Sequence, residues 1–494
     1  MTQHSLTILR NKFTQRSFAW LLILGIGVSF SVCEHTWNYS TLKSFQLESN
    51  EVEDQLAEGS IVRRLAIAGF GMLGIVLVLM PGKYQITLDG PLGILVVAFY
   101  VYALMSVLWA DQPERSVRRL AVIVLMLAGI MAVVRHLSMR DLIMATALIG
   151  SSFIVIGIIA EIAHKTFTPW DLSYRFAGTA HPNTQGAYCA FCAIASYYAW
   201  RTSRTKISVA WLAVAVFATV FLVLTKSRSN AMGFLFGLGA CWYITTDTPK
   251  RLLMTFGLPM AVAGGLLFAS FVGVGLIDKI DEAASGVGRG ESSITTLSGR
   301  LPLWENLVRR STLRPCIGYG WDSFWTPERV VKVSAEEGWT VPSAHSVPID
   351  VLLSLGLFGL FMFSAVIVLA TWRCAKELVR DKKVIYGFPF TLIMFGFISG
   401  IFESGFAQPS SFDSFTAACS IAMVAFRRRE EEEKEDDESE LTSADHDDEP
   451  VQTQRKSTGV PWDVKEWKQD EYHSANKRKL TWTEDDDDDW GLKS

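Results

Sequence analysis

The chain has few cysteines, and their spacing suits neither a metal site nor a disulfide framework. The seven cysteines are scattered over 494 residues, and four of them lie inside apolar runs: Cys189, Cys192, Cys241 and Cys419. The acidic residues of 278–282 are spaced like metal ligands, but they lie beside Lys279 in a glycine-rich loop. We therefore expect neither a metal nor a cofactor.

The chain also lacks the alternation of apolar and polar faces that a soluble protein of this length would show. Half of its residues are hydrophobic, and its mean hydropathy is +0.25. Apolar runs of roughly 16–26 residues recur, close to the length that spans a hydrocarbon core about 30 Å thick. The pattern predicts an all-α polytopic membrane protein with about twelve spans: 17–33, 64–80, 91–109, 119–134, 142–163, 185–200, 207–225, 229–245, 252–277, 348–371, 384–402 and 411–426.

The first apolar run resembles a signal peptide only in part. It follows Arg10, Lys12 and Arg16, but SFSVCEH at its end has no convincing small-residue cleavage site. We expect it to remain as an uncleaved first span.

Positive charge is scarce in every second loop between the predicted spans. With twelve spans, the basic residues fall mainly in the loops that share a side with both termini, as the positive-inside rule requires. This predicts that both termini lie in the cytoplasm.

The last 68 residues differ from the rest of the chain. Residues 427–494 hold 12 basic and 23 acidic residues, a net charge of −11, whereas residues 1–426 have a net charge of +7. Low hydrophobicity and blocks of like charge predict disorder. We expect a transmembrane domain over 1–426 and a disordered, acidic, cytoplasmic tail over 427–494.

One long outer loop is predicted over residues 278–347. Within it, apolar residues recur at the spacing of a short amphipathic helix on the membrane surface: Leu303, Trp304, Leu307 and Val308. A turn at 318–320 ends this unit, and Trp321, Phe324 and Trp325 are expected in the aromatic belt of the interface.

A few basic side chains fall on the outer face, against the charge bias. Arg175, Arg228 and Arg300 are three of them. Guanidinium groups stay charged and present planar forks of donors that match phosphate oxygens. Each one alone could be a snorkelling or carboxylate-paired arginine, but together they indicate a site for a lipid-linked phosphate.

His345 is the first candidate for chemistry, because an ionisable group at the end of a membrane helix tends to be functional. A histidine can remove a proton from an attacking hydroxyl. His181, followed by Pro182 and Asn183, competes for that role or only holds its loop. Glu403 is expected to pair with an arginine or to orient the base.

These segments together resemble the O-antigen ligase superfamily, which also contains O-antigen and exopolysaccharide polymerases. Its ligases carry a His-(Asn/Ser/Gln), nine residues, Gly-x-x-Gly motif, which His345-Ser346 and Gly356-Leu357-Phe358-Gly359 match. RFAGTAHPNTQG, KSRSNAMG and SGRLPLWENL with GYGWDSFW also resemble family segments. The resemblance covers about residues 170–410.

The resemblance implies a GT-C-like, metal-independent glycosyltransferase of the bacterial inner membrane. It would act at the periplasmic face, which makes the outer loop 278–347 a periplasmic loop. It would move a glycan from undecaprenyl pyrophosphate to a hydroxyl of a glycan, lipid or protein acceptor. Catalytic roles then fall to His345 and Arg300. Substrate binding falls to Arg175, Arg228, His181 and Glu403, with membrane lipids but no nucleic acid as further partners.

Three alternatives remain open at this point, one of which is a lipid-binding scaffold without catalysis. A polymerase would use the same donor and join repeat units on the carrier. A twelve-span transporter or flippase would show two similar halves and ionisable residues near the midplane, but no internal repeat is seen and the unusual charges gather at one face.

Overall fold

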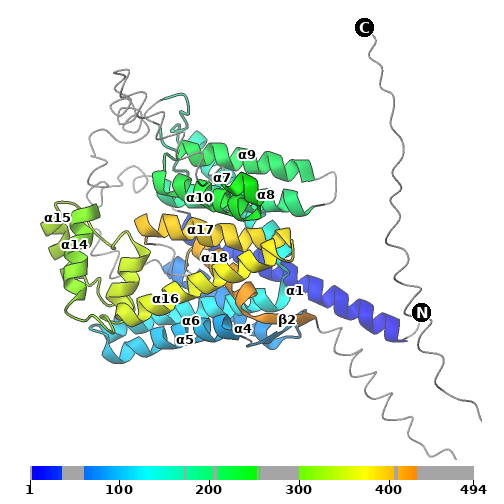
Figure 1. The fold of residues 1–494 in the computed structure, drawn as a ribbon, viewed down its shortest axis with the longest axis horizontal. Coiled ribbons are helices and arrows are strands. Elements are labelled where there is room, and N and C mark those ends of the chain that lie inside the picture. The colour runs from blue at the N-terminus through cyan, green and yellow to red at the C-terminus, as the bar shows by residue number, and fades with distance from the viewer. Residues whose placement is uncertain are drawn as a thin grey trace, which may run out of the picture. The chain divides into compact units, whose positions relative to one another are not determined.

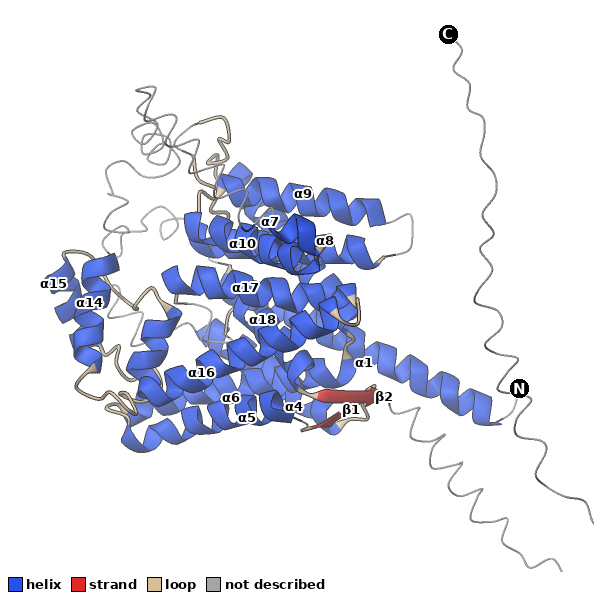
Figure 2. Cartoon of the chain, in the orientation of Figure 1, coloured by secondary structure: helices blue, strands red, loops and turns tan. Residues whose placement is uncertain are grey.

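The computed structural model describes residues 3–35, 61–88, 90–171, 174–203, 208–252, 255, 300–404 and 410–430. In these ranges the chain is almost wholly helical, as predicted (Figure 2). The helices are α1 (Gln3–Glu34), α4 (Ile61–Leu79), α5 (Gly90–Met105), η1 (Ser106–Trp109), α6 (Pro113–His136), α7 (Met139–Ala163), α8 (Pro182–Thr202), α9 (Ser208–Leu224), α10 (Arg228–Thr245), α11 (Thr248–Leu252), α14 (Arg300–Ser311), α15 (Pro327–Glu337), α16 (Val347–Val379), η4 (Val384–Tyr386), α17 (Gly387–Phe402) and α18 (Phe412–Ala425).

The chain is a multi-pass membrane protein. Seven of the described helical segments are long and apolar enough to cross a membrane: Thr14–Glu34, Ile61–Leu79, Gly90–Trp109, Pro113–His136, Met139–Ala163, Val347–Val379 and Val384–Phe402. Two more apolar helices, α9 and α18, are shorter. Eleven of the twelve predicted runs coincide with helices, and the run 252–277 lies almost entirely outside the described residues.

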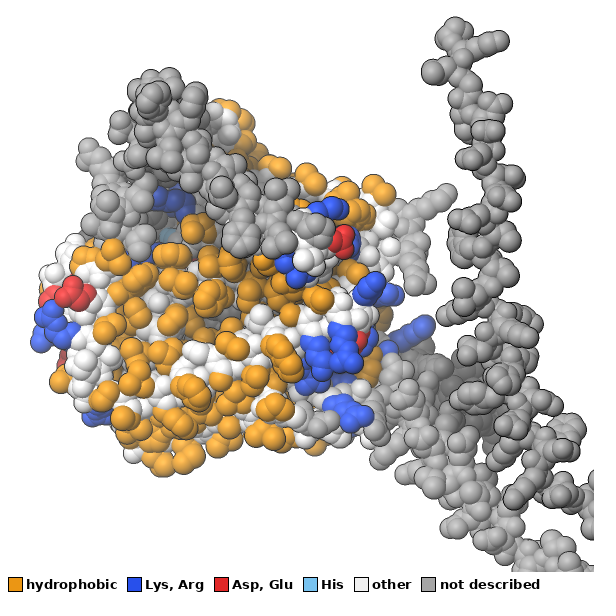
Figure 3. All heavy atoms as spheres, in the orientation of Figure 1, with side chains coloured by type: hydrophobic (Ala, Val, Ile, Leu, Met, Phe, Trp, Pro, Cys, Tyr) orange, Lys and Arg blue, Asp and Glu red, His pale blue; other side chains and the backbone are white. Residues whose placement is uncertain are grey.

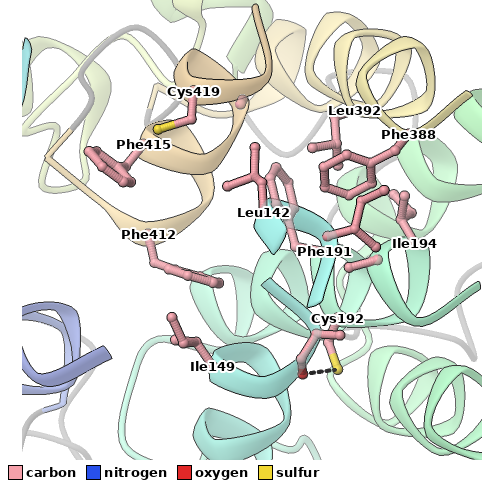
Figure 4. Packing of buried hydrophobic residues seen from close by; sticks show 14 of the residues in the cluster. Leu142, Ile149, Phe191, Cys192, Ile194, Phe388, Leu392, Phe412, Phe415 and Cys419 are labelled. Atoms are coloured by element: carbon pink, nitrogen blue, oxygen red, sulfur yellow. Dashed lines mark hydrogen bonds between the residues drawn. The ribbon is translucent and has the colours of Figure 1, made fainter. Parts of the chain in front are cut away.

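The core of the bundle lies where α7, α8, α17 and α18 pack together (Figure 4). Phe191 from α8 meets Phe395 from α17 edge to face at 5.4 Å. Close approach depends on small residues: a Cβ at Gly150 in α7 would lie 2.8 Å from Cys192 in α8. Because α8 is buried on nearly all sides, it carries few residues that face lipid, and its apolar character serves packing.

The surface has the distribution that a membrane protein needs. Hydrophobic side chains dominate the middle of the face in Figure 3. Most of the charged side chains visible there lie towards the ends, where Figure 1 labels α14 and α15 at one end and β2 at the other. Lipid-facing residues such as Trp20, Leu65 and Val223 are more than 60% exposed. An apolar band between two charged ends suits a bilayer.

The predicted amphipathic helix is present as α14, but it packs differently from the expectation. Leu303 and Leu307 are fully buried against α15 and the segment 319–325, so they belong to a small core of the loop itself. Phe324 and Trp325 lie in the same core, and Trp321 packs against Phe99 of α5. The expected aromatic belt is therefore wrong for this segment, because these rings are 1–5% exposed.

The helix α16 is broken at Gly356, which has φ of +69° and ψ of −169°. At this break, Leu357 N–H donates to Pro315 O at 2.8 Å, and Tyr319 N–H donates to Leu353 O at 2.8 Å. The loop turn with Gly318 and Gly320, both at positive φ, is thus bonded to the interrupted helix. A Cβ at Gly356 would collide with the backbone of Cys316, so only glycine fits this conformation and approach.

At the other end of the bundle, β1 (Tyr84–Thr87) pairs antiparallel with β2 (Arg427–Glu430). Arg428 donates to Leu137 O at 2.8 Å and lies 4.7 Å from the centre of the Tyr84 ring. The first four residues of the predicted tail are therefore joined to the transmembrane domain.

Candidate functional site

Five pieces of chain meet at the end of the bundle that carries α14. They are the beginning of α8, the beginning of α10, the end of α17, the beginning of α14 and the loop before α16. Each brings one or more of the predicted site residues, although they are far apart in the sequence.

Arg300 and Glu403 form the centre of the cluster. Arg300 Nη2 lies 3.3 Å from Glu403 Oε1, and Arg300 Nη1 donates to the Phe402 carbonyl. Both side chains are largely buried. Burial raises the pKa of Glu403, and the charge of Arg300 and its hydrogen bond oppose that rise. The expected pairing of Glu403 with an arginine is present.

Asn183, which the sequence did not single out, joins a second predicted arginine to this pair. Its Nδ2 donates to Glu403 Oε1 at 2.8 Å, and its Oδ1 accepts from Arg175 Nη2 at 3.4 Å. Asn230 Nδ2 donates to the Asn183 carbonyl at 2.6 Å. The only hint in the sequence was the position of Asn183 in the His-Pro-Asn segment.

The loop that carries Arg175 is held by a buried carboxylate near the end of α7. Glu161 Oε1 accepts the N–H groups of Ala177 at 2.9 Å and Gly178 at 2.7 Å, and Glu161 Oε2 accepts the Tyr174 hydroxyl at 2.5 Å. Arg175 Nε also donates to Thr225 O at 3.1 Å. The role of Glu161 has no signal in the sequence, because this residue lies inside an apolar run.

His345 lies against the cluster with one ring nitrogen unused. Its Nε2 is buried and has no hydrogen-bond partner among the described residues. The ring is 5.5 Å from that of Trp339 and tilted by 34°. Burial, then the charge of Arg300 and then His181, lower the pKa of His345 to about 4. The imidazole is therefore neutral at neutral pH, with an acceptor nitrogen available in one tautomer.

The surrounding loop holds His345 in an uncommon backbone conformation. Its φ is +48°, a region that few non-glycine residues adopt and that tends to occur at functional sites. Trp304 Nε1 donates to Ala344 O at 2.9 Å, and Asp350 Oδ1 accepts from Trp325 Nε1 at 3.0 Å and from Ala344 N–H at 3.3 Å. Residues from α14, the loop core and α16 together fix this conformation.

The last two predicted residues lie at helix beginnings. His181 is the exposed N-cap of α8, where its Nδ1 accepts the Asn183 N–H at 3.2 Å. Arg228 is the first residue of α10, and the next residue, Ser229, approaches Glu403 Oε1 to 3.5 Å. Arg228 has no ion pair among the described residues. Within those residues no group of three or more His, Cys, Asp or Glu side chains lies close enough to hold a metal.

The fold and the cluster define a class: a multi-span membrane protein with guanidinium groups, a carboxylate and an imidazole gathered at one end of its helices. Comparison with known proteins shows what this chain resembles. The model of the O-antigen ligase family matches residues 213–364, which confirms the predicted resemblance.

Two relatives are similar over most of their length. The exopolysaccharide production protein ExoQ of Rhizobium meliloti is 22% identical over 63% of this chain and 71% of its own length. An O-antigen ligase of Pseudomonas aeruginosa is 24% identical over 63% of this chain and 73% of its own length. The chain is thus distantly related to both proteins.

Proposed function

We propose that this protein transfers a glycan from undecaprenyl pyrophosphate to an acceptor hydroxyl at the periplasmic face of the inner membrane. The proposal rests on the buried Nε2 of His345, which has no hydrogen-bond partner among the described residues and feels the charge of Arg300. A polar atom in this position is costly unless a ligand satisfies it.

Arg175, Arg228 and Arg300 would bind the pyrophosphate. Arg300 and Arg175 are preoriented, since Glu403 bonds the guanidinium group of Arg300 and Asn183 bonds that of Arg175. Guanidinium groups that are already in place stabilise negative charge as it develops on a leaving group without reorganising. Arg228, at the beginning of α10, could turn towards the same group.

His345 would act on the acceptor. The acceptor oxygen attacks the anomeric carbon and its proton passes to Nε2, while the carbon–oxygen bond to the pyrophosphate breaks and the leaving group keeps the electron pair. A single displacement of this kind inverts the anomeric carbon. The negative donor would offset the field of Arg300, so that donor binding raises the pKa of His345 and makes it a better base.

Two variants test the proposal in purified, membrane-reconstituted protein supplied with a lipid-linked oligosaccharide. His345→Ala and Arg300→Ala are each expected to lower transfer by 100-fold or more, on the order of the contribution of one acid–base or electrostatic group. Arg309→Ala is the matched control, because Arg309 lies on α14 with an exposed side chain and should retain activity. Near-normal transfer by His345→Ala would remove the histidine from the mechanism.

The similarity to ExoQ makes a polymerase the second candidate. A polymerase and a ligase would share the fold and the donor, and they would differ in the acceptor. Extension of the glycan on its carrier would identify a polymerase, whereas transfer to a lipid core or protein acceptor would identify a ligase.

A further inference from the structure

A polar cavity lies at the same end of the bundle as the candidate site. It has a volume of about 190 Å³ and is lined by the end of α1, the beginnings of α4, α6 and α18, and Trp321. Of the charged residues that line it, Arg63 and Arg119 are positive and Glu34 is negative. Its inner part is apolar, with Ile67 and Met126 among the lining residues.

An apolar groove of about 310 Å³ lies between α5, α6, α16 and α18. Val97, Val101 and Leu104 line it from α5 and are 38–47% exposed, so the groove has access to the lipid-facing surface. Ala417 and Ala418 form part of the opposite wall on α18. Small side chains there leave room for a hydrocarbon chain.

The two cavities follow each other along the same pair of helices. On α6 the polar cavity extends to Met126, and the groove begins at Leu127. On the other side, the polar cavity includes Ser411, and the groove begins one turn further on at Ser414. Such a polar compartment at the helix ends, followed by an apolar one in the bundle, matches an amphipathic lipid.

The end of α1 separates this pair of cavities from the Arg300 cluster. Glu34, which lines the polar cavity, accepts the Tyr188 hydroxyl at 2.5 Å and the Phe412 N–H at 3.2 Å. The next residue, His35, has its Nδ1 2.5 Å from Thr179 Oγ1, in the loop of Arg175 and His181. The cavities are therefore distinct from the proposed donor site but adjacent to it.

The charge state of the polar cavity favours one type of head group. Arg119 Nε lies 2.8 Å from Asp322 Oδ2, and Arg63 donates from Nε and Nη2 to Cys33 O at 3.0 and 2.6 Å. Both guanidinium groups are thus partly engaged by the protein. They suit a singly charged phosphodiester better than a pyrophosphate, which carries more charge.

We propose that the polar cavity and the groove bind an anionic glycerophospholipid of the surrounding membrane. Its phosphodiester would contact Arg63 and Arg119, and one acyl chain would lie between α5 and α18. The bound lipid would fix the end of α1 against the loop of Arg175, so this site could affect transfer without contacting substrate.

The test measures lipid retention directly. Purified full-length protein is incubated with phosphatidylglycerol or phosphatidylcholine, and bound lipid is measured by native mass spectrometry. We expect wild type to retain phosphatidylglycerol preferentially. Arg63→Gln and Arg119→Gln should each lower that retention about fivefold, the order expected for one arginine near a lipid phosphate.

The control is Arg118→Gln, one residue away on α6 with an exposed side chain, which should retain lipid as wild type does. Ala418→Phe, which fills the groove, should also lower retention, and thermal unfolding reports whether each variant is folded. Equal retention of both lipids, unchanged retention in folded Arg119→Gln, or preference for undecaprenyl pyrophosphate over phosphatidylglycerol would overturn the proposal. None of these results depends on glycan transfer.

Discussion

At the residue scale, the candidate site depends on shared hydrogen-bond partners. Glu403 accepts from Arg300, Asn183 and Ser229, side chains from three different elements. Removing this acceptor would leave buried donors unpaired, at a cost of about 1–3 kcal/mol each. The carboxylate therefore positions the guanidinium group of Arg300 directly and that of Arg175 through Asn183.

The lowered pKa of His345 makes a prediction for pH dependence. Because its pKa is about 4, the neutral form that accepts a proton persists well below the usual histidine range. We expect kcat/KM, which reports the free enzyme, to fall only as pH drops through about 4. The corresponding fall in kcat should occur at higher pH, since bound pyrophosphate offsets Arg300. Coincident acid limbs in rate profiles from pH 4 to 8 would contradict this account.

Glu161 gives a second prediction at this scale. Glu161→Ala leaves three hydrogen-bond donors around the Arg175 loop without their acceptor, whereas Glu161→Gln keeps one carbonyl oxygen for two of them. We expect Glu161→Ala to raise KM for the donor at least tenfold and Glu161→Gln to raise it less. A folded Glu161→Ala variant with wild-type KM would show that the loop does not need this carboxylate.

At the element scale, the broken helix α16 connects the loop to the membrane domain. Leu353 and Ser354 carbonyls before the break accept from Tyr319 and Gly320, while Leu357 after the break donates back to the loop. The same helix begins two residues after His345. The Gly-x-x-Gly part of the motif thus fixes the position of the turn at 315–320 relative to α16, which begins beside the histidine.

Gly356→Ala tests this connection. The substitution puts a side chain into a positive-φ position and into the backbone of Cys316, so we expect destabilisation by about 2 kcal/mol or more. Thermal unfolding of the purified protein measures it. Gly239→Ala is the control, because a Cβ there meets nothing within 4 Å, and helix propensity then favours alanine. Equal unfolding temperatures for the two variants would contradict the role of Gly356.

At the scale of the whole molecule, one end of the bundle holds the charged cluster and the other holds the strand pair. Because β1 pairs with β2, the boundary between the transmembrane domain and the tail falls after β2 rather than at Arg427. Residues beyond it carry the acidic blocks that led us to expect a disordered cytoplasmic tail.

Two truncations test this boundary. A chain that ends after Lys434 keeps β2, and we expect its transfer activity and thermal stability to match the full chain. A chain that ends after Phe426 loses the pairing with β1 and the bond from Arg428 to Leu137, so it should unfold at lower temperature. Loss of transfer in the longer truncation would mean that the tail has a function of its own.

The sequence alone predicts the class of fold and several of the side chains that the structure brings together in the candidate site. Apolar run lengths are set by bilayer thickness, so eleven predicted runs coincide with helices. Charge against the positive-inside bias marked Arg175 and Arg300, which the structure brings into one network. His345 was identified as an ionisable group at the end of a predicted membrane helix, and the nine residues between Ser346 and Gly356 can be counted directly in the sequence.

The contacts that hold these residues in place exist only in the folded chain. Glu161 and Asn183 were missed because the role of a buried carboxylate or amide depends on the groups that it bonds. Two of the partners of Glu161 are backbone N–H groups, and the partner of Asn183, Glu403, is 220 residues away in the sequence. The rings of Phe324 and Trp325 were misassigned, because an apolar residue at a membrane surface and one in a small loop core have the same local pattern. The break at Gly356 is likewise fixed by the opposing turn at 315–320, which no local sequence signal could supply.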